Sequence, residues 1–297
     1  MIEITNTHTG KIYVDRDRQL EFLTVGDYGK ENNIKADFLG LHKEIQGVKH
    51  HDVDLTQKWV ASISTQKGCP MRCQFCDCPK YGFHGNISRE ELAFQVETIL
   101  QGESVEGTKR FNVHFARMGE PTWNQQVLAF AEHDLRDLVK VYIEADTVHP
   151  VVSTMLPRAN KELEQFILDW CRIKNEVYGG EAGLQFSINS TNDEQRAAQF
   201  NNMSLSLQGI SKLAAKLPKP AGRKYTLNFA VTEETILLPK GKGSYPCRSD
   251  YPPLPRGSRP PRALSKCLWT WGYPGSASAL LICTLMFESD SSRRDFL

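Results

Sequence analysis

The sequence predicts an α/β fold built from repeated βα units around a parallel sheet. The main observation is that, from about residue 57 to residue 238, short apolar and β-branched runs alternate with amphipathic stretches of helical spacing. A second observation is the length of 297 residues, which suffices for one large α/β domain with additional segments at its ends. No internal repeat is visible, so we expect one globular core between two dissimilar ends.

Five short runs in this region have the composition of buried strands. They are Trp59–Ser64, Phe111–Arg117, Pro150–Thr154, Gly183–Asn189 and Lys224–Val231. The sequence from Ser88 to Glu91 matches a capping box, which predicts that a helix covers residues 90–100. Apolar stripes predict two more helices, around residues 163–170 and 205–217.

The two ends differ from this core. Residues 1–56 are expected to form a short strand-rich extension, with strands at Lys11–Val14 and Leu20–Val25. Residues 239–297 hold eight of the fifteen prolines and sustain neither a helical nor a strand period. Two interpretations of this irregular tail stay open: a Pro-rich segment that buries too little apolar surface to fold, or unselected sequence after a reading-frame shift near Ile236. The predicted domain boundaries are therefore 1–56, 57–238 and 239–297.

Composition and charge exclude several classes of protein. No apolar run reaches the roughly 20 residues of a membrane helix, and the N-terminus carries no export signal, so we expect a cytoplasmic protein without a membrane partner. Residues 1–238 hold 27 Lys and Arg against 31 Asp and Glu, which provides no general attraction to nucleic acid. Eight cysteines in such a chain favour metal or redox chemistry over disulfides.

The segment after the first core strand contains four of these cysteines. Cys69, Cys73 and Cys76 have the spacing C-x3-C-x2-C, which brings three thiolates to three corners of an iron–sulfur cubane and leaves the fourth iron open to chelation. Soft thiolates suit such a cluster or zinc. The alternative is a zinc site that also uses Cys78, although structural zinc sites usually have two separated ligand pairs. A non-catalytic zinc-binding or interaction protein is therefore the alternative function.

The same spacing, with Phe75 directly before the last cysteine, resembles the motif of the radical S-adenosylmethionine (SAM) superfamily. The resemblance implies a partial (βα)6 barrel in which Cys69, Cys73 and Cys76 bind a 4Fe-4S cluster and the methionine part of SAM chelates the open iron. It also implies reductive cleavage of SAM to a 5′-deoxyadenosyl radical, with a reductant such as flavodoxin or ferredoxin as partner. Cys78 has no role in this scheme.

Further stretches resemble the RlmN/Cfr-like RNA adenine C-methyltransferases, in the same order over residues 57–235. They are Ser64–Cys69, Gly82-Phe83, Met118–Pro121 with Asn124, Ser153-Thr154 and Ser187–Arg196. The resemblance implies that SAM is bound by Gly119, Glu120, Ser153, Ser187, Ile188 and Asn189, and that RNA is the substrate. Glu120 follows a predicted strand, and ligands of parallel α/β sheets bind at the carboxyl ends of strands.

The pattern also departs from that family. Ser62 stands seven residues before Cys69, where the family has a cysteine, and no cysteine of residues 239–297 lies in a motif that matches the family's methyl-carrying cysteine. The sixth barrel strand has no counterpart, and only 56 residues replace the RNA-binding module. The motifs therefore support the initiation of radical chemistry, while the substrate and the transfer of a methyl group stay open. A truncated, inactive product of an enzyme gene is a further alternative.

Overall fold

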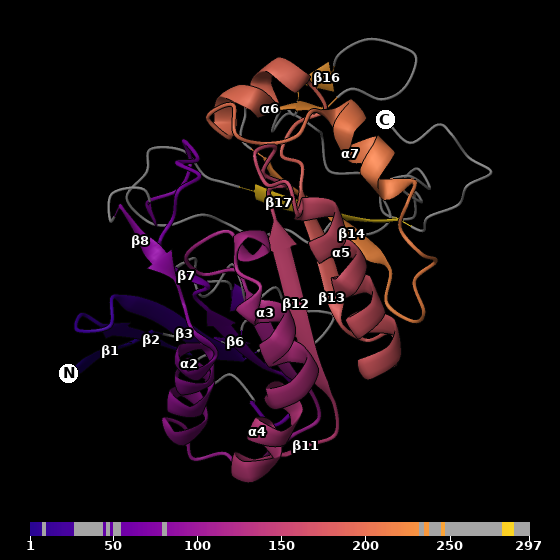
Figure 1. Cartoon of the computed structure of the whole chain (residues 1–297). Helices are drawn as coiled ribbons and strands as arrows, with labels where there is room; N and C mark the ends of the chain where they lie inside the picture. Colours follow the sequence, from indigo (N-terminus) through magenta and orange to yellow (C-terminus); the bar gives the residue numbers. More distant parts are fainter. Residues whose placement is uncertain are drawn as a thin grey trace.

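A nine-stranded sheet forms the centre of the computed structural model, which describes residues 1–7, 10–26, 44–45, 48–49, 55–78, 82–231, 235–237, 245–246 and 281–287. Figure 1 shows its strands crossing the molecule. In spatial order they are β1 (Ile2–Asn6), β2 (Gly10–Asp15), β3 (Leu20–Gly26), β6 (Trp59–Ile63), β10 (Phe111–Phe115), β12 (Val148–Thr154), β13 (Gly183–Ser187), β14 (Tyr225–Val231) and β17 (Leu281–Phe287). Short two-stranded ladders lie outside it: β4 (Glu44–Ile45) with β5 (Val48–Lys49), β7 (Gln66–Gly68) with β8 (Phe83–Asn86), β9 (Gly107–Thr108) with β11 (Glu144–Ala145), and β15 (Ile236–Leu237) with β16 (Tyr245–Pro246).

The middle of the sheet is parallel, which confirms the predicted α/β class. Strands β6, β10, β12, β13 and β14 pair in parallel, and they correspond to the five predicted core strands. On one side the sheet continues through the antiparallel strands β3, β2 and β1, and on the other β17 pairs antiparallel with β14. Among the described residues, the parallel part therefore has five strands where the resemblance implies six.

The loops after β10 and β13 show why two predicted strands end early. Strand β13 was expected to continue to Asn189, but Asn189 has a φ of +64°, which an extended strand does not accommodate. After β10, the backbone N–H groups of Ala116 and Arg117 both turn to the carbonyl of Ile63 instead of continuing the ladder. Both departures occur at the carboxyl ends of the strands, where the candidate site lies.

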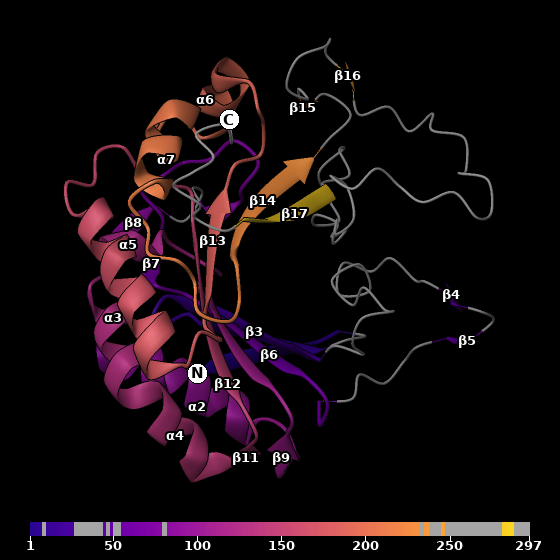
Figure 2. The same ribbon diagram turned by 90° about the vertical axis from the view of Figure 1, so that its right-hand side faces the viewer.

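Helices cover one face of the parallel strands, as Figure 2 shows. They are α2 (Arg89–Gln101), α3 (Gln126–Ala129), α4 (Leu135–Tyr142), α5 (Leu163–Arg172), α6 (Asp193–Gln199) and α7 (Leu207–Ala214). The π-helical turn η3 (Phe130–Asp134) joins α3 to α4, and a second one, η4 (Ile173–Val177), extends α5. The predicted capping box is confirmed, because Ser88 and Glu91 bond each other's backbone N–H groups at the start of α2. The helical stretch 126–142 was not predicted.

Side chains alternate between the two faces of the sheet. Trp59, Phe111 and Phe115 point toward the helices and belong to the main apolar core. Between them, positions on the opposite face are polar and half-buried: Ser62 on β6, His114 on β10, Ser153 on β12, Gln185 on β13 and Asn228 on β14. Ser153 Oγ and Asn228 Nδ2 both donate to Gln185 Oε1, at 2.7 and 2.9 Å, so one carboxamide links three strands.

The ends of the chain are described only in part. The irregular tail expected over residues 239–297 lies outside the described residues apart from β16 and β17. The division into 1–56, 57–238 and 239–297 stays a prediction. Within the described residues, no helix combines the length and the apolar character that crossing a membrane requires.

The capping box provides a test of the helix assignment. Ser88→Ala removes the side-chain acceptor for the Glu91 N–H, and we expect it to lower the free energy of unfolding by about 1 kcal/mol. Denaturant unfolding measures this change. Ser104→Ala, at an exposed position beyond the end of α2, is the matched control and should change stability little. Equal effects of the two substitutions would contradict the role of Ser88.

Candidate metal and cofactor site

Two buried amide side chains join the loops at the carboxyl edge of the sheet. Gln66 accepts a hydrogen bond from the backbone N–H of Glu120 at 2.8 Å and donates to Asn86 Oδ1 at 2.8 Å. Asn124 Nδ2 donates to the carbonyls of Thr65 and Ile87, each at 2.8 Å. The loop after β6, the loop after β10 and the segment around β8 are therefore held in one arrangement.

Two glycines allow these loops to approach closely. Gly119 has a φ of +101°, and a Cβ atom added there would lie 2.6 Å from Cβ of Gln66. Gly68 has a φ of +76°, and an added Cβ would lie 1.9 Å from the carbonyl oxygen of Gly82. Both positions need a residue that has no side chain and that accepts the left-handed region. Cys69 then begins the cysteine loop, with its N–H donating to the same Gly82 carbonyl at 3.0 Å.

The cysteine loop packs against helix α6. Cys69, Cys73 and Cys76 are half-buried, and the first two pack on a small apolar cluster of Met71, Met155 and Phe200. The backbone N–H of Gln74 donates to the carbonyl of Gln199 at 2.9 Å, and the rings of Phe75 and Phe200 meet edge to face with centroids 5.4 Å apart. The loop is thus fixed at both of its ends and in its middle.

The three thiols lie close enough to affect one another's ionisation. Burial is the main cause that raises the pKa of Cys69 to about 11, and the charges of Glu120 and Cys76 add to it. Burial also raises the pKa of Cys73, with added contributions from Cys76, Cys69 and Glu120. The hydrogen bond from the Cys78 thiol lowers the pKa of Cys76 to about 7. A positive metal centre would reverse the cost of forming these thiolates.

Cys78 lies directly beside this set. It is buried, and its Sγ donates to the carbonyl of Arg117 at 3.8 Å. The potential ligand atoms of Cys76, Asp77 and Cys78 lie within 4.8 Å of one another, so this group is the tightest potential metal-ligand set among the described residues. The geometry therefore keeps both ligand sets open: the three cysteines of the C-x3-C-x2-C motif, and a set that includes Cys78.

Glu120 is fixed at the ends of β10 and β12. Its side chain is buried, with Oε1 accepting from the N–H and the hydroxyl of Thr122 and Oε2 accepting from the N–H of Met155 at 3.0 Å. Burial raises the pKa of Glu120, while hydrogen bonds from Thr154, Met155 and Thr122 oppose that shift. Because its charge also acts on Cys69 and Cys73, the predicted cofactor residue and the predicted metal ligands lie together.

The remaining predicted cofactor residues lie at the carboxyl ends of β12 and β13, and their side chains have different contacts. Ser153 and Ser187 are half-buried on these strands. Ile188 has its side chain in the apolar core, and its N–H donates to the carbonyl of Asn228 at 2.7 Å. Asn189 is buried and turns back, with Oδ1 accepting from the N–H of Ala230 at 3.0 Å.

Arg196 holds the turn that contains these residues, and its role was missed in the sequence. The side chain is 1% exposed, and its Nη1 donates to the carbonyls of Ser187 and Ile188, each at 2.6 Å. Its Nη2 donates to the carbonyl of Met155 at 3.1 Å. The only sequence signal was its position at the end of a motif, because nothing local indicates that an arginine will be buried against carbonyls.

Three buried polar atoms near the carboxyl edge of the sheet have no hydrogen-bond partner within the described part of the chain. They are Trp123 Nε1, Asn189 Nδ2 and Gln199 Oε1. Buried polar groups are satisfied in most proteins, so an unpaired group calls for an explanation. Trp123 packs with Cys69 and Cys73, and Gln199 bonds to the cysteine loop through its carbonyl, so an unpaired donor and an unpaired acceptor beside the thiols fit a polar ligand that is bound next to a metal.

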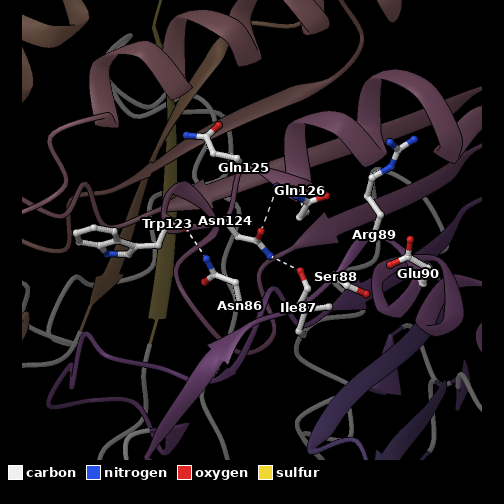
Figure 3. Close-up of a pocket in the computed structure, with 9 residues that line it drawn as sticks. All are labelled: Asn86, Ile87, Ser88, Arg89, Glu90, Trp123, Asn124, Gln125 and Gln126. Atoms are coloured by element: carbon white, nitrogen blue, oxygen red, sulfur yellow. Dashed lines mark hydrogen bonds between the residues drawn. The ribbon is translucent and has the colours of Figure 1, made fainter.

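The pocket in Figure 3 is a separate feature. It is lined by the segments Asn86–Glu90 and Trp123–Gln126, and its amide side chains bond to backbone atoms within the lining. None of the predicted metal or cofactor residues lines it. The figure shows the ring of Trp123 pointing away from Arg89 and Glu90, on the opposite side of the pocket.

Comparisons with known proteins point to the family that the motifs resemble. A probable dual-specificity RNA methyltransferase RlmN of Leptospira interrogans (strain Fiocruz L1-130) is 40% identical over 85 residues, which are 29% of this chain and 23% of the relative. The dual-specificity RNA methyltransferase RlmN of Sorangium cellulosum is 28% identical over 172 residues, covering 57% of this chain and 40% of the relative. The RlmN enzyme of Sulfurovum sp. (strain NBC37-1) is 32% identical over 98 residues, covering 31% and 26%.

No protein-family model matches the chain. A crystal structure of a radical SAM methyltransferase from Sphaerobacter thermophilus matches with a TM-score of 0.48 and 15% identity, over 79% of this chain and 59% of that one. The chain thus spans at most 40% of the length of the three curated relatives named here. Those relatives confirm that the chain resembles the RlmN/Cfr-like branch, as its motifs indicate.

The contact at Gly119 can be tested against a second glycine. Gly119→Ala combines a positive φ with a clash against Gln66, whereas Gly85→Ala has a similar φ of +118° and no atom within 4 Å of the added Cβ. We expect both changes to lower stability, by roughly 1–3 kcal/mol for backbone strain, with the larger loss at Gly119. Denaturant unfolding compares them. A Gly119→Ala protein no less stable than Gly85→Ala would show that the loops are not held against each other as described.

Proposed function

We propose that this chain is a radical S-adenosylmethionine enzyme that reductively cleaves SAM at a 4Fe-4S cluster. The observation that carries the proposal is the gathering of Cys69, Cys73 and Cys76 with the buried carboxylate of Glu120 on loops at the carboxyl edge of a parallel sheet. The similarity to RlmN methyltransferases supports it independently of the geometry.

The residues present fit both groups. Three thiols in one loop suit a cubane with one open iron, and the unpaired polar atoms of Trp123 and Gln199 belong to residues that contact that loop. When bound, the cluster supplies a low-potential electron, and SAM supplies the carbon–sulfur bond that this electron breaks. Cys69, Cys73 and Cys76 would hold the cluster, and Gly119, Glu120, Ser153, Ser187, Ile188 and Asn189 are the proposed cofactor-binding residues.

The chain's own residues are proposed to orient the bound groups and to exclude water from the site. Glu120 is the proposed acceptor for the ammonium group of SAM, since its carboxylate is buried and immobilised by Thr122 and Met155. Arg196 is proposed to set the position of the turn at 187–189 through its bonds to two carbonyls of that turn. Met71, Met155 and Phe200 exclude water from the side of the loop that carries Cys69 and Cys73.

The proposed cleavage of SAM does not by itself identify the substrate. The relatives named above are RNA methyltransferases, so RNA is the substrate class that we propose to test first, with a flavodoxin or ferredoxin as reductant. Ser62 lies on β6 opposite His114 of β10, in the position where the family has a cysteine. A serine hydroxyl, unlike a cysteine thiol, does not ionise to a nucleophile near neutral pH, so the methyl transfer of the relatives is not part of the proposal.

A second candidate function is zinc binding without catalysis, which the proximity of Cys76, Asp77 and Cys78 favours. The two functions differ in the ligands that they need. A cluster with an open iron does not use Cys78, whereas a four-cysteine zinc site does.

Substitution of single cysteines separates these functions. After anaerobic reconstitution with iron and sulfide, we expect Cys73→Ala to lose nearly all bound iron, because two thiolates do not hold the cubane. Cys78→Ala is the matched control and should keep the iron content and the visible absorption of the native protein. If the native protein binds one zinc and no iron, and both variants lose it, the radical SAM proposal fails.

The proposed role of Glu120 in the cofactor site can be tested by measuring the binding of SAM. Glu120→Gln keeps the size of the side chain but removes its charge, and we expect the affinity of the reconstituted protein for SAM to fall roughly 10- to 100-fold, as for a charged hydrogen bond of about 1.5–3 kcal/mol. Anaerobic equilibrium dialysis with labelled SAM measures the change. Glu106→Gln, at an exposed position before β9, should bind like the native protein. Equal affinity in the Glu120 variant would remove this residue from the cofactor site.

A further inference from the structure

We propose that Trp123 donates a hydrogen bond from its indole N–H to a sulfur atom of the cluster that Cys69 and Cys73 help to hold. The inference rests on the proposed function and adds a residue that the motifs do not mark. Its starting point is the buried Nε1 atom of Trp123, which has no hydrogen-bond partner among the residues that the structure describes.

The position of Trp123 is fixed from both sides along the chain. It is the last residue of the 3-10 helix η2 (Pro121–Trp123), whose first turn is capped by Glu120. Its carbonyl accepts a hydrogen bond from Asn86 Nδ2 at 2.8 Å, and the next residue, Asn124, is tied to Thr65 and Ile87. The backbone position from which the indole extends is therefore fixed.

The side chain of Trp123 lies beside the cysteine loop. Trp123 packs with Cys69 and Cys73 around the same apolar cluster of Met71, Met155 and Phe200. Its ring points away from Arg89 and Glu90 across the neighbouring pocket, as Figure 3 shows, so these charged groups are not its partners. Trp123 therefore lies between the pocket, which it lines, and the thiols, on which it packs.

An indole N–H buried without an acceptor is costly. Leaving a buried donor unsatisfied costs roughly 1–3 kcal/mol, and a Phe at the same position would avoid that cost. Tryptophan is therefore unfavourable here unless an acceptor is present in the functional protein. Sulfur atoms at the thiolate end of the bound cluster are acceptors at the place where the indole packs.

Such a bond would change the redox properties of the cluster. Hydrogen bonds to cluster sulfurs favour the reduced form, because they stabilise its additional negative charge. The indole hydrogen bond would matter more in this site because Glu120 and three thiolates already place negative charge close to the cluster. Trp123 would make the cluster easier to reduce without contacting SAM or changing the number of ligands.

The experiment compares Trp123→Phe with native protein after anaerobic reconstitution. At a fixed solution potential, we expect the ratio of reduced to oxidised cluster, measured by electron paramagnetic resonance, to fall about tenfold in the variant, which corresponds to about 59 mV for one electron. With ¹⁵N-labelled indole, electron–nuclear double resonance of the reduced native cluster should show a nitrogen coupling that is lost in Trp123→Phe.

Trp170→Phe is the matched control, because Trp170 Nε1 already donates to the carbonyl of Gly183 at 2.9 Å in the core. It should leave the ratio unchanged and lower the melting temperature of the metal-free protein. Metal-free Trp123→Phe should melt at or above the native temperature, since no bond is lost.

An unchanged ratio, an unchanged nitrogen coupling, or a lower melting temperature of metal-free Trp123→Phe would each overturn the inference while a cluster still forms. If the native protein forms no cluster, the proposed function fails and the inference with it. Iron content therefore distinguishes the two failures.

Discussion

Buried carboxamides hold the candidate site together. Gln66 satisfies the backbone N–H of Glu120 and contacts Asn86, and Asn124 satisfies two carbonyls of other loops. Backbone polar groups in these loops cannot rely on strand ladders, and leaving them unpaired would be costly. Cys69, Gly119 and Glu120 lie on loops that this network orders, so the geometry of this part of the site depends on it before any ligand binds.

The site also concentrates negative charge away from water. Three thiols and a carboxylate share one region, and the charges of Glu120 and Cys76 oppose ionisation of their neighbours. Arg196 is the cation that acts on Cys73, and its donors are already used by carbonyls. A bound metal group would therefore provide most of the compensating positive charge, which is consistent with the soft ligand set.

The sequence predicted the elements whose pattern is local. The five parallel strands and the capped helix α2 follow from runs of apolar residues and from Ser88 with Glu91, and the structure confirms them. The helical stretch 126–142 was missed because the π-helical turn η3 interrupts its apolar period. Arg196, Gln66 and Trp123 were not predicted as parts of the site. Gln66 bonds to a segment 54 residues away, and Trp123 packs on cysteines about 50 residues away, which no local pattern encodes. Arg196 bonds to carbonyls eight and nine residues away and to Met155, 41 residues away, and its burial among them has no local signal either.

The face of the sheet opposite the helices has a consequence for selectivity. Ser153, Gln185 and Asn228 form a hydrogen-bonded chain across three strands, with Ser62 and His114 on the strands beside it. An apolar molecule would not match these polar side chains, so a molecule bound against this face would need hydrogen-bonding groups of its own. Selectivity on this face would then depend on the arrangement of donors and acceptors on the bound molecule. A molecule of equal size that lacks one of them would bind more weakly.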